Sequence, residues 1–441
     1  MTASRKLFGT DGVRGVAGDD LTAALARDLG AAGARFAGPA EAVLIGRDTR
    51  ESGVWLEHAL VDGITSAGGH AVSAGVIPTP GVAVLARLSH AALGAVVSAS
   101  HNPYQDNGIK FLAGDGRKLP DADEARLEAL VAAPDDGLPA GSADVLEGAA
   151  ETYGGWLVDM YGQGVPGGLA LGIDCANGAA HVVAPDVFRQ AGVELHAIGV
   201  QPDGRNINAG VGSTHLESIS GLVLERGLAG GIAFDGDADR CLAVDSRGRV
   251  VNGDAIIAVL ALDRHARGAL DGDCVVITSM TNMGFHRLMR DAGIGFEVTG
   301  VGDRYVLAAM LATGATLGGE QSGHVVDLVH HTTGDGLATA LMLLAALDRL
   351  GMTLDDAAEL VVVFPQKLVA VAADRSALAG CDRIWQEVEL ASQELGQDGR
   401  VVLRASGTEP VVRVMVEAAD PAQCDALCDR LCGVVRAEIG V

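Results

Sequence analysis

Short apolar runs rich in β-forming residues alternate with segments of helical periodicity through most of this 441-residue chain. Runs of the first kind lie at Ala42–Gly46, Gly94–Ser98, Leu169–Asp174, Gly230–Phe234 and Val275–Thr278. Between them, apolar residues recur at i, i+3 and i+4 in Val54–Ala67, Leu216–Leu224 and Leu337–Leu350. This alternation predicts α/β domains with parallel or mixed sheets. Ligand sites in such sheets lie at loops beyond the carboxyl ends of the strands.

The chain is too long for one ordinary hydrophobic core and indicates several domains. The segment Ala132–Asp144, rich in Ala, Asp, Gly and Pro, predicts an exposed loop near a first boundary. The last block has a different order, with strands at Leu368–Val371, Val401–Leu403 and Val411–Glu417 and helices between and after them. We therefore predict three α/β domains and a smaller C-terminal α+β domain, over residues 1–155, 156–252, 253–365 and 366–441.

Charge and hydropathy exclude several classes of partner. The net charge of −25 argues against nucleic acid, whose backbone would be repelled. The amino terminus has no apolar signal core, and the longest apolar stretch, Leu337–Leu347, is far shorter than the ~20 residues that span a bilayer. The seven cysteines lack metal-ligand or disulfide spacing, which favours buried thiols over a zinc site. We expect a cytoplasmic protein with no membrane and no nucleic-acid partner.

Ser100 lies in the run Ser98-Ala99-Ser100-His101-Asn102-Pro103, directly after the apolar run Leu93–Val97. A serine hydroxyl beside a histidine at the end of a strand indicates a nucleophile displayed on a loop. Ser100 is therefore the candidate nucleophile, and His101 is a candidate partner in proton transfer.

Three carboxylates follow the apolar run Gly230–Phe234 at alternate positions, as Asp235, Asp237 and Asp239. Side chains at this spacing can converge on one hard cation, and oxygen ligands suit Mg²⁺, which keeps positions open for phosphate oxygens. An Asp-rich surface turn would look similar. An aspartyl nucleophile of the haloacid-dehalogenase kind at Asp235 is a second alternative.

Other polar loops carry groups that suit a sugar phosphate. Glu320 and Ser322, in a glycine-rich run from Gly318 to His324, can hold sugar hydroxyls. Arg404 and Arg413 flank Ser406-Gly407-Thr408, where hydroxyls, backbone N–H groups and guanidiniums can bind a phosphate, although an ordinary turn is the alternative. Near the amino terminus, Gly9–Gly15 is a further glycine-rich loop with a cation, and Arg47 and Arg50 form either ligand contacts or a structural pair with Asp48.

In combination, these loops resemble the α-D-phosphohexomutase superfamily over essentially the whole chain. The motifs that carry the resemblance are Gly9-Thr10-Asp11-Gly12-Val13-Arg14-Gly15, Ser98-Ala99-Ser100-His101-Asn102-Pro103, Asp106-Asn107-Gly108-Ile109-Lys110-Phe111, Asp235-Gly236-Asp237-Ala238-Asp239-Arg240, Gly319-Glu320-Gln321-Ser322-Gly323-His324 and Arg404-Ala405-Ser406-Gly407-Thr408-Glu409-Pro410. The resemblance implies four domains around a central cleft. It also implies a phosphoserine at Ser100 and one Mg²⁺ held by a phosphoserine oxygen and the three aspartates.

The resemblance also implies a set of ligand contacts. Sugar hydroxyls would meet Glu320 and Ser322, and the distal phosphate would meet the C-terminal loop. The implied substrate-binding residues are Thr10, Arg14, Arg240, Arg304, Glu320, Ser322, Arg404, Ser406, Gly407, Thr408 and Arg413. A hexose 1,6-bisphosphate would serve as intermediate or activator, and the protein would be a monomer or homodimer.

Finer residues resemble the glucosamine branch of this superfamily, namely Gln321, Val301–Val306 and Asn206–Gly210. The implied reaction interconverts glucosamine 6-phosphate and glucosamine 1-phosphate and feeds UDP-N-acetylglucosamine and cell-wall precursor synthesis. A phosphomannomutase/phosphoglucomutase of the same superfamily is the alternative, and a catalytically silent sugar-phosphate-binding protein is another. For proton transfer we expect Lys110, with a pKa lowered by Mg²⁺ and neighbouring arginines, or else His101.

Overall fold

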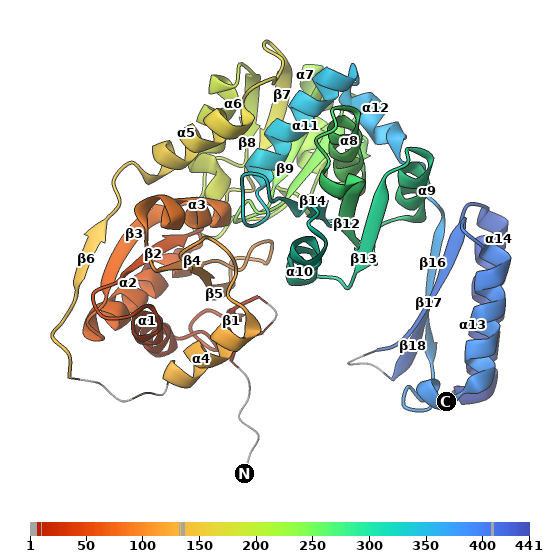
Figure 1. Cartoon of the computed structure of the whole chain (residues 1–441), viewed down its shortest axis with the longest axis horizontal. Helices are drawn as coiled ribbons and strands as arrows, with labels where there is room; N and C mark the ends of the chain where they lie inside the picture. The colour runs from red at the N-terminus through yellow and green to blue at the C-terminus, as the bar shows by residue number, and fades with distance from the viewer. Residues whose placement is uncertain (1–6, 10, 132, 134–136, 407–409) are drawn as a thin grey trace. The chain divides into compact units, whose positions relative to one another are not determined.

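The computed structural model describes residues 7–9, 11–131, 133, 137–406 and 410–441. By its internal contacts the chain divides into two compact units, one of residues 1–279 and 297–359 and one of residues 280–296 and 360–441. The first unit carries three mixed sheets with helices packed on them, and the second carries a small antiparallel sheet (Figure 1). This is the predicted fold class, three α/β domains and a smaller C-terminal α+β domain.

The first sheet has six strands in the order β1-β5-β4-β2-β3-β6. Strands β2, β3, β4 and β6 are parallel, and β5 turns back antiparallel to β4. Its elements are β1 (Val13–Val16), α1 (Ala23–Ala37), β2 (Ala42–Arg47), α2 (Glu51–Ser66), β3 (His70–Val76), α3 (Thr79–Ser89), β4 (Leu93–Val97), β5 (Asp106–Ala113), α4 (Asp121–Val131) and β6 (Ser142–Val145). Helices α1 and α2 pack closely because Gly63 has no side chain, and a Cβ there would lie 1.9 Å from the carbonyl of Arg27.

The stretch 132–144, predicted to be a loop or an exposed connection, ends in an exposed strand, because Ser142–Asp144 belong to β6. This strand is exposed at all four residues and pairs in parallel with β3 at the edge of the sheet. An exposed edge strand shows no hydrophobic alternation, so composition alone indicates a loop.

The second sheet has the order β11-β10-β9-β7-β8, with β7, β8 and β9 parallel and β10 antiparallel to β9. Its elements are α5 (Ala149–Tyr161), β7 (Ala170–Asp174), the 3₁₀ turn Ala179–Val182, α6 (Ala184–Gln190), β8 (Glu194–Ile198), α7 (Glu217–Arg226), β9 (Gly230–Phe234), β10 (Cys241–Asp245) and β11 (Val250–Val251). All five residues of β9 are buried, so the loop that follows it begins inside the protein.

The third sheet has the order β13-β12-β14-β15. Its elements are α8 (Gly253–Ala266), the 3₁₀ turn Asp271–Asp273, β12 (Cys274–Thr278), β13 (Gly295–Thr299), α10 (Asp303–Thr313), β14 (Leu317–Gly319), β15 (Val325–Asp327), α11 (Gly336–Leu350) and α12 (Leu354–Leu360). Asp335 caps α11 by accepting from the backbone N–H of Ala338. Within the described residues no single helix is long and apolar enough to cross a membrane, and α11 with α12 meets that test only as a pair bent by 93°.

The second unit is built on an antiparallel sheet in the order β16-β18-β17. Its elements are α9 (Met283–Asp291), β16 (Gln366–Ala372), the 3₁₀ turn Leu378–Gly380, α13 (Asp382–Leu395), β17 (Gly399–Ala405), β18 (Val411–Ala418) and α14 (Pro421–Ile439). Helices α13 and α14 pack on the sheet over a core that includes Val412, Val414 and Leu431. Helix α9 joins this unit because Glu417 accepts from the backbone N–H of Met283 at 2.6 Å. The predicted domain boundaries stay a prediction.

Candidate active site

Ser100 stands on a tight turn just after β4 and is only 3% exposed. Its φ of +51° lies in the left-handed region, which a non-glycine residue rarely adopts and which surrounding contacts must hold. The backbone N–H of Ser100 donates to Ser98 Oγ at 3.0 Å, and Ser98 Oγ donates to Asp48 at 2.5 Å. The serine is thus displayed on a constrained loop, as the sequence predicts.

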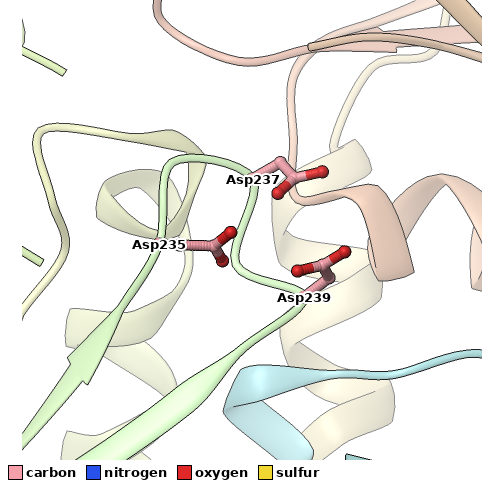
Figure 2. A group of neighbouring side chains, drawn as sticks. All are labelled: Asp235, Asp237 and Asp239. Carbon is pink, nitrogen blue, oxygen red and sulfur yellow. The ribbon is translucent and has the colours of Figure 1, made fainter. Parts of the chain in front are cut away.

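The acidic loop between β9 and β10 brings three carboxylates together. Oxygen atoms of Asp235, Asp237 and Asp239 lie within 4.8 Å of one another (Figure 2). Asp235 and Asp237 are 0% and 1% exposed, so the alternative of an Asp-rich surface turn is wrong. Burial raises the pKa of Asp235, and the charges of Asp239 and Asp237 raise it further.

These carboxylates fit a bound cation. The second oxygens of Asp237 and Asp239 are buried and accept no hydrogen bond from the described residues. Buried, unsatisfied carboxylate oxygens are costly unless a charge pairs with them. Ser100 Oγ donates to Asp235 at 2.5 Å, so the serine oxygen lies beside the same three carboxylates, which stand on another sheet.

Thr79, at the first turn of α3, fixes one of these aspartates although no sequence pattern singles it out. Its hydroxyl donates to Asp237 Oδ2 at 2.6 Å, and its backbone N–H donates to the Asp237 carbonyl at 3.0 Å. Lys110 Nζ, from β5, donates to the same carboxylate oxygen at 3.2 Å. The first domain therefore orients a carboxylate of the second.

Lys110 lies among carboxylates. Burial acts to lower the pKa of Lys110, but the charges of Asp11, Asp237 and Asp239 outweigh it and raise that pKa. The predicted lowering depends on Mg²⁺ as well as on arginines, and it stays a prediction. For His101, burial and then the charges of Arg240 and Arg14 lower the pKa.

A pocket of about 460 Å³ opens beside Ser100. Loops of all three α/β domains line it, and six predicted site residues are on its walls: Arg14, Ser100, His101, Asp239, Arg240 and Glu320. His324 also lines it, and its Nδ1 lies 3.6 Å from Asp239. Burial acts to lower the pKa of His324, but the charge of Asp239 outweighs it and raises this pKa to about 9. Cations and carboxylates thus share one partly enclosed space.

Two predicted substrate contacts, Arg304 and Ser322, are not on the pocket walls. Arg304, at the start of α10, donates to Asp121 at 2.8 Å and lies 3.6 Å from Glu124. The Ser322 hydroxyl is buried and forms no hydrogen bond within the described part of the chain. Glu320, in contrast, lines the pocket and accepts from the backbone N–H of Gly302 at 2.9 Å.

The arginines near the amino terminus have different roles. Arg14, on the pocket wall, pairs with Asp11. Arg50 is fully buried and pairs with Asp48 at 2.8 Å, so the structural alternative for this arginine is confirmed. Thr10 lies outside the described residues.

The second unit holds the remaining predicted residues. Arg404 on β17 and Arg413 on β18 are directly opposed in the antiparallel register, which places two like charges on one face of the sheet. A bound anion would reduce the repulsion between them. Ser406 follows β17 and is 7% exposed, while Gly407 and Thr408 lie outside the described residues.

Comparison with known proteins agrees with this fold. Residues 5–137, 158–248 and 252–364 match alpha/beta/alpha domains I, II and III of the family described as Phosphoglucomutase/phosphomannomutase, and residues 366–434 match its C-terminal domain. The chain is 51% identical to a phosphoglucosamine mutase of Rubrobacter xylanophilus, with 98% of each chain covered. It is 48% identical to one of Nocardia farcinica, with 98% of this chain and 99% of the relative covered.

Among solved structures, a phosphoglucomutase/phosphomannomutase family protein of Burkholderia thailandensis superimposes with a TM-score of 0.81 at 25% identity, over 99% of both chains. The four-domain fold and the serine–aspartate site therefore define a phosphohexomutase, an isomerase. Within that class, the chain belongs to the phosphoglucosamine mutase family. The haloacid-dehalogenase alternative for Asp235 is accordingly wrong.

Proposed function

We propose that this chain interconverts glucosamine 6-phosphate and glucosamine 1-phosphate, with Ser100 as the phosphoryl carrier. The observation that carries the proposal is the Ser100 hydroxyl, held 2.5 Å from Asp235 of a buried three-carboxylate cluster at the edge of a pocket that also holds Arg14 and Arg240. The glucosamine preference is supported by near-50% identity to named relatives over almost the whole chain. The product feeds UDP-N-acetylglucosamine and cell-wall precursor synthesis.

In the first transfer, the ester bond between phosphorus and Ser100 Oγ breaks as a bond to O1 of the sugar forms, and the O1 proton passes to a base. The resulting 1,6-bisphosphate then reorients. The bond between phosphorus and O6 breaks as a bond to Ser100 Oγ forms, O6 takes up a proton as Ser100 Oγ gives one up, and glucosamine 1-phosphate is left. The same bisphosphate, added from outside, would phosphorylate a resting enzyme. One binding site must therefore accept either phosphate, a role we assign to Arg404, Ser406, Gly407, Thr408 and Arg413.

Asp235, Asp237, Asp239 and a Ser100 phosphate oxygen would hold one Mg²⁺. When bound, Mg²⁺ offsets the negative charge of the phosphoserine and of the transferring group. Arg240 and Arg14 face the same pocket and attract the anionic sugar phosphate despite the net charge of −25.

His101 and Lys110 remain the two candidates for proton transfer. His101 lines the pocket, and its Nδ1 lies 3.3 Å from Ser100 Oγ. Lys110 is 8% exposed and its ammonium contacts Asp237. This geometry favours His101 as the group that reaches a sugar hydroxyl and gives Lys110 the task of holding Asp237. Glu320 is proposed to hold sugar hydroxyls, and Thr10, Arg304 and Ser322 remain proposed contacts.

Two measurements test the proposal together. Intact-mass analysis followed by peptide mapping should find one added phosphate on Ser100 after incubation with glucose 1,6-bisphosphate. Assays with glucosamine, glucose and mannose 6-phosphates side by side should give the highest kcat/KM for the glucosamine compound. Phosphate on another residue would contradict the carrier, and a higher kcat/KM for glucose or mannose phosphate would favour the phosphomannomutase/phosphoglucomutase alternative.

The amino-acid composition supports a proposal for the compartment and the partners of the protein. The seven cysteines are all free thiols, which supports a reducing compartment and hence the cytoplasm. The acidic charge supports the absence of a nucleic-acid partner. A monomer or homodimer remains the proposed assembly.

A further inference from the structure

Two side chains that do not line the pocket, Arg50 and Asn208, hold the main chain of the serine loop by hydrogen bonds. Arg50, from the first domain, donates to the carbonyls of Ser100 at 2.9 Å and Asn102 at 2.8 Å. It also donates to the carbonyls of Pro103 and, at 3.0 Å, of Asp106. All of these bonds come from a guanidinium whose residue is 0% exposed.

Asn208, from the second domain, donates to two of the same carbonyls. Its Nδ2 lies 2.9 Å from the Ser100 oxygen and 3.1 Å from the Asn102 oxygen. Asn208 is 6% exposed and has a φ of +58°, a conformation that asparagine tolerates better than most residues. Gly236, in the acidic loop between β9 and β10, allows this loop to approach the serine loop closely, because a Cβ at Gly236 would lie 2.6 Å from the Ser100 carbonyl oxygen.

We infer that Arg50 and Asn208 are positioning residues that hold Ser100 in its left-handed conformation and so aim its hydroxyl at Asp235. The inference rests on the proposed phosphoryl transfer at Ser100. A φ of +51° at serine is unfavourable by itself, and the two donors share carbonyls that this conformation turns toward them. Because Asn208 lies between β8 and α7, beside Gly236 of the aspartate loop, it also links the serine to the loop that the serine must face.

The test uses Asn208→Gly, since glycine accepts the positive φ and removes only the side-chain donor. Asn177→Gly is the matched control, because Asn177 also has a positive φ, of +48°, and its side chain bonds to Asn206 and Gln201 rather than to the serine loop. We expect Asn208→Gly to lower kcat about tenfold or more with little change in KM, since small misplacement of a reacting group is costly. Asn177→Gly should keep both constants near those of the wild type.

A second readout does not depend on turnover. Hydrogen–deuterium exchange of peptides covering 98–103 should be faster in Asn208→Gly than in the wild type and unchanged in Asn177→Gly. Arg50→Lys keeps the charge beside Asp48 but loses the guanidinium fork, and it should show the same faster exchange.

The possible failures are distinguishable. If the wild type neither takes up phosphate at Ser100 nor interconverts the sugar phosphates, the proposed function fails. Faster exchange in Asn208→Gly would still support the role of Asn208 in holding the serine loop. Equal exchange and equal kcat in the two asparagine variants would overturn the inference. A rise in KM at constant kcat would also overturn it, because that is the sign of a substrate contact.

Discussion

The pocket beside Ser100 and the arginine pair of the C-terminal sheet, both proposed to bind phosphate, differ in how their charges are buried. Around Ser100 most of the charged side chains are buried, with Lys110 against Asp237 and His324 beside Asp239. On the C-terminal sheet, Arg404 is exposed and stands opposite the like-charged Arg413. Breaking and making an ester bond requires atoms held in fixed positions. A bisphosphate that must reorient requires contacts that accept either of its two phosphates. We infer that the first region determines kcat and the second determines KM.

Ser100→Ala should have the largest effect, because it removes the atom that carries the phosphoryl group. We expect turnover to fall on the order of a thousandfold or more and phosphate uptake from glucose 1,6-bisphosphate to vanish in the intact mass. Ser89→Ala, on α3, is the matched control, since among the described residues the Ser89 hydroxyl donates only to the Leu85 carbonyl in the same helix. A Ser100→Ala enzyme that keeps more than about a tenth of the rate, ~1.4 kcal/mol in barrier, would contradict the carrier assignment.

Asp237→Asn should come next, because it removes one cluster charge and weakens the partner of Lys110. Titration calorimetry should show Mg²⁺ affinity lowered at least about tenfold, consistent with the loss of an anionic ligand. Turnover at saturating Mg²⁺ should also fall. Asp186→Asn, an exposed aspartate paired with Arg189 in the same domain, should change neither quantity. Unchanged Mg²⁺ affinity in Asp237→Asn would place the metal elsewhere.

Local parts of the fold and site could be predicted from sequence, and long-range parts could not. The apolar runs at 42–46 and 230–234 become β2 and β9, and the alternate spacing of the three aspartates brings their carboxylates together. Their strand and loop are contiguous, so periodicity and spacing suffice. Thr79, in contrast, reaches Asp237 across 158 residues of chain, and no local pattern marks it. The same reason explains the Lys110 pKa, since Asp11 meets Lys110 only through the pairing of β1 with β5.

Sequence patterns also fail to mark two residues that lie inside recognised motifs, because each motif points to other residues. His324 belongs to the Glu320 loop, and Asn208 belongs to a run that served only to distinguish a branch of the superfamily. The sequence shows that both residues are present, but it does not show which groups their side chains contact. A side chain that donates to a carbonyl on another domain leaves no trace in the spacing of its own segment.

Arg404→Ala tests the other side of the comparison and should have a smaller effect than the changes beside Ser100. It removes a guanidinium that can bind phosphate through two hydrogen bonds, so KM for both glucosamine phosphates should rise about tenfold, ~1.4 kcal/mol. The kcat should change by less than about threefold. Arg436→Ala, an exposed arginine on α14 of the same unit, should leave both constants unchanged. A fall in kcat at constant KM would reverse the roles of the two regions.

Ionic strength should have the smallest effect and should separate the two regions without a mutation. Exposed charges are screened over about 8–10 Å at 0.1–0.15 M salt, whereas buried pairs are screened much less. Raising sodium chloride from about 0.05 to 0.3 M should therefore raise KM about two- to threefold and leave kcat nearly constant. In Arg404→Ala the dependence of KM on salt should be weaker, because part of the exposed charge is gone. If kcat falls with salt while KM holds in the wild type, the charges around Ser100 are more open to solvent than their burial indicates. If Arg404→Ala keeps the full salt dependence of KM, the exposed arginine is not the phosphate contact.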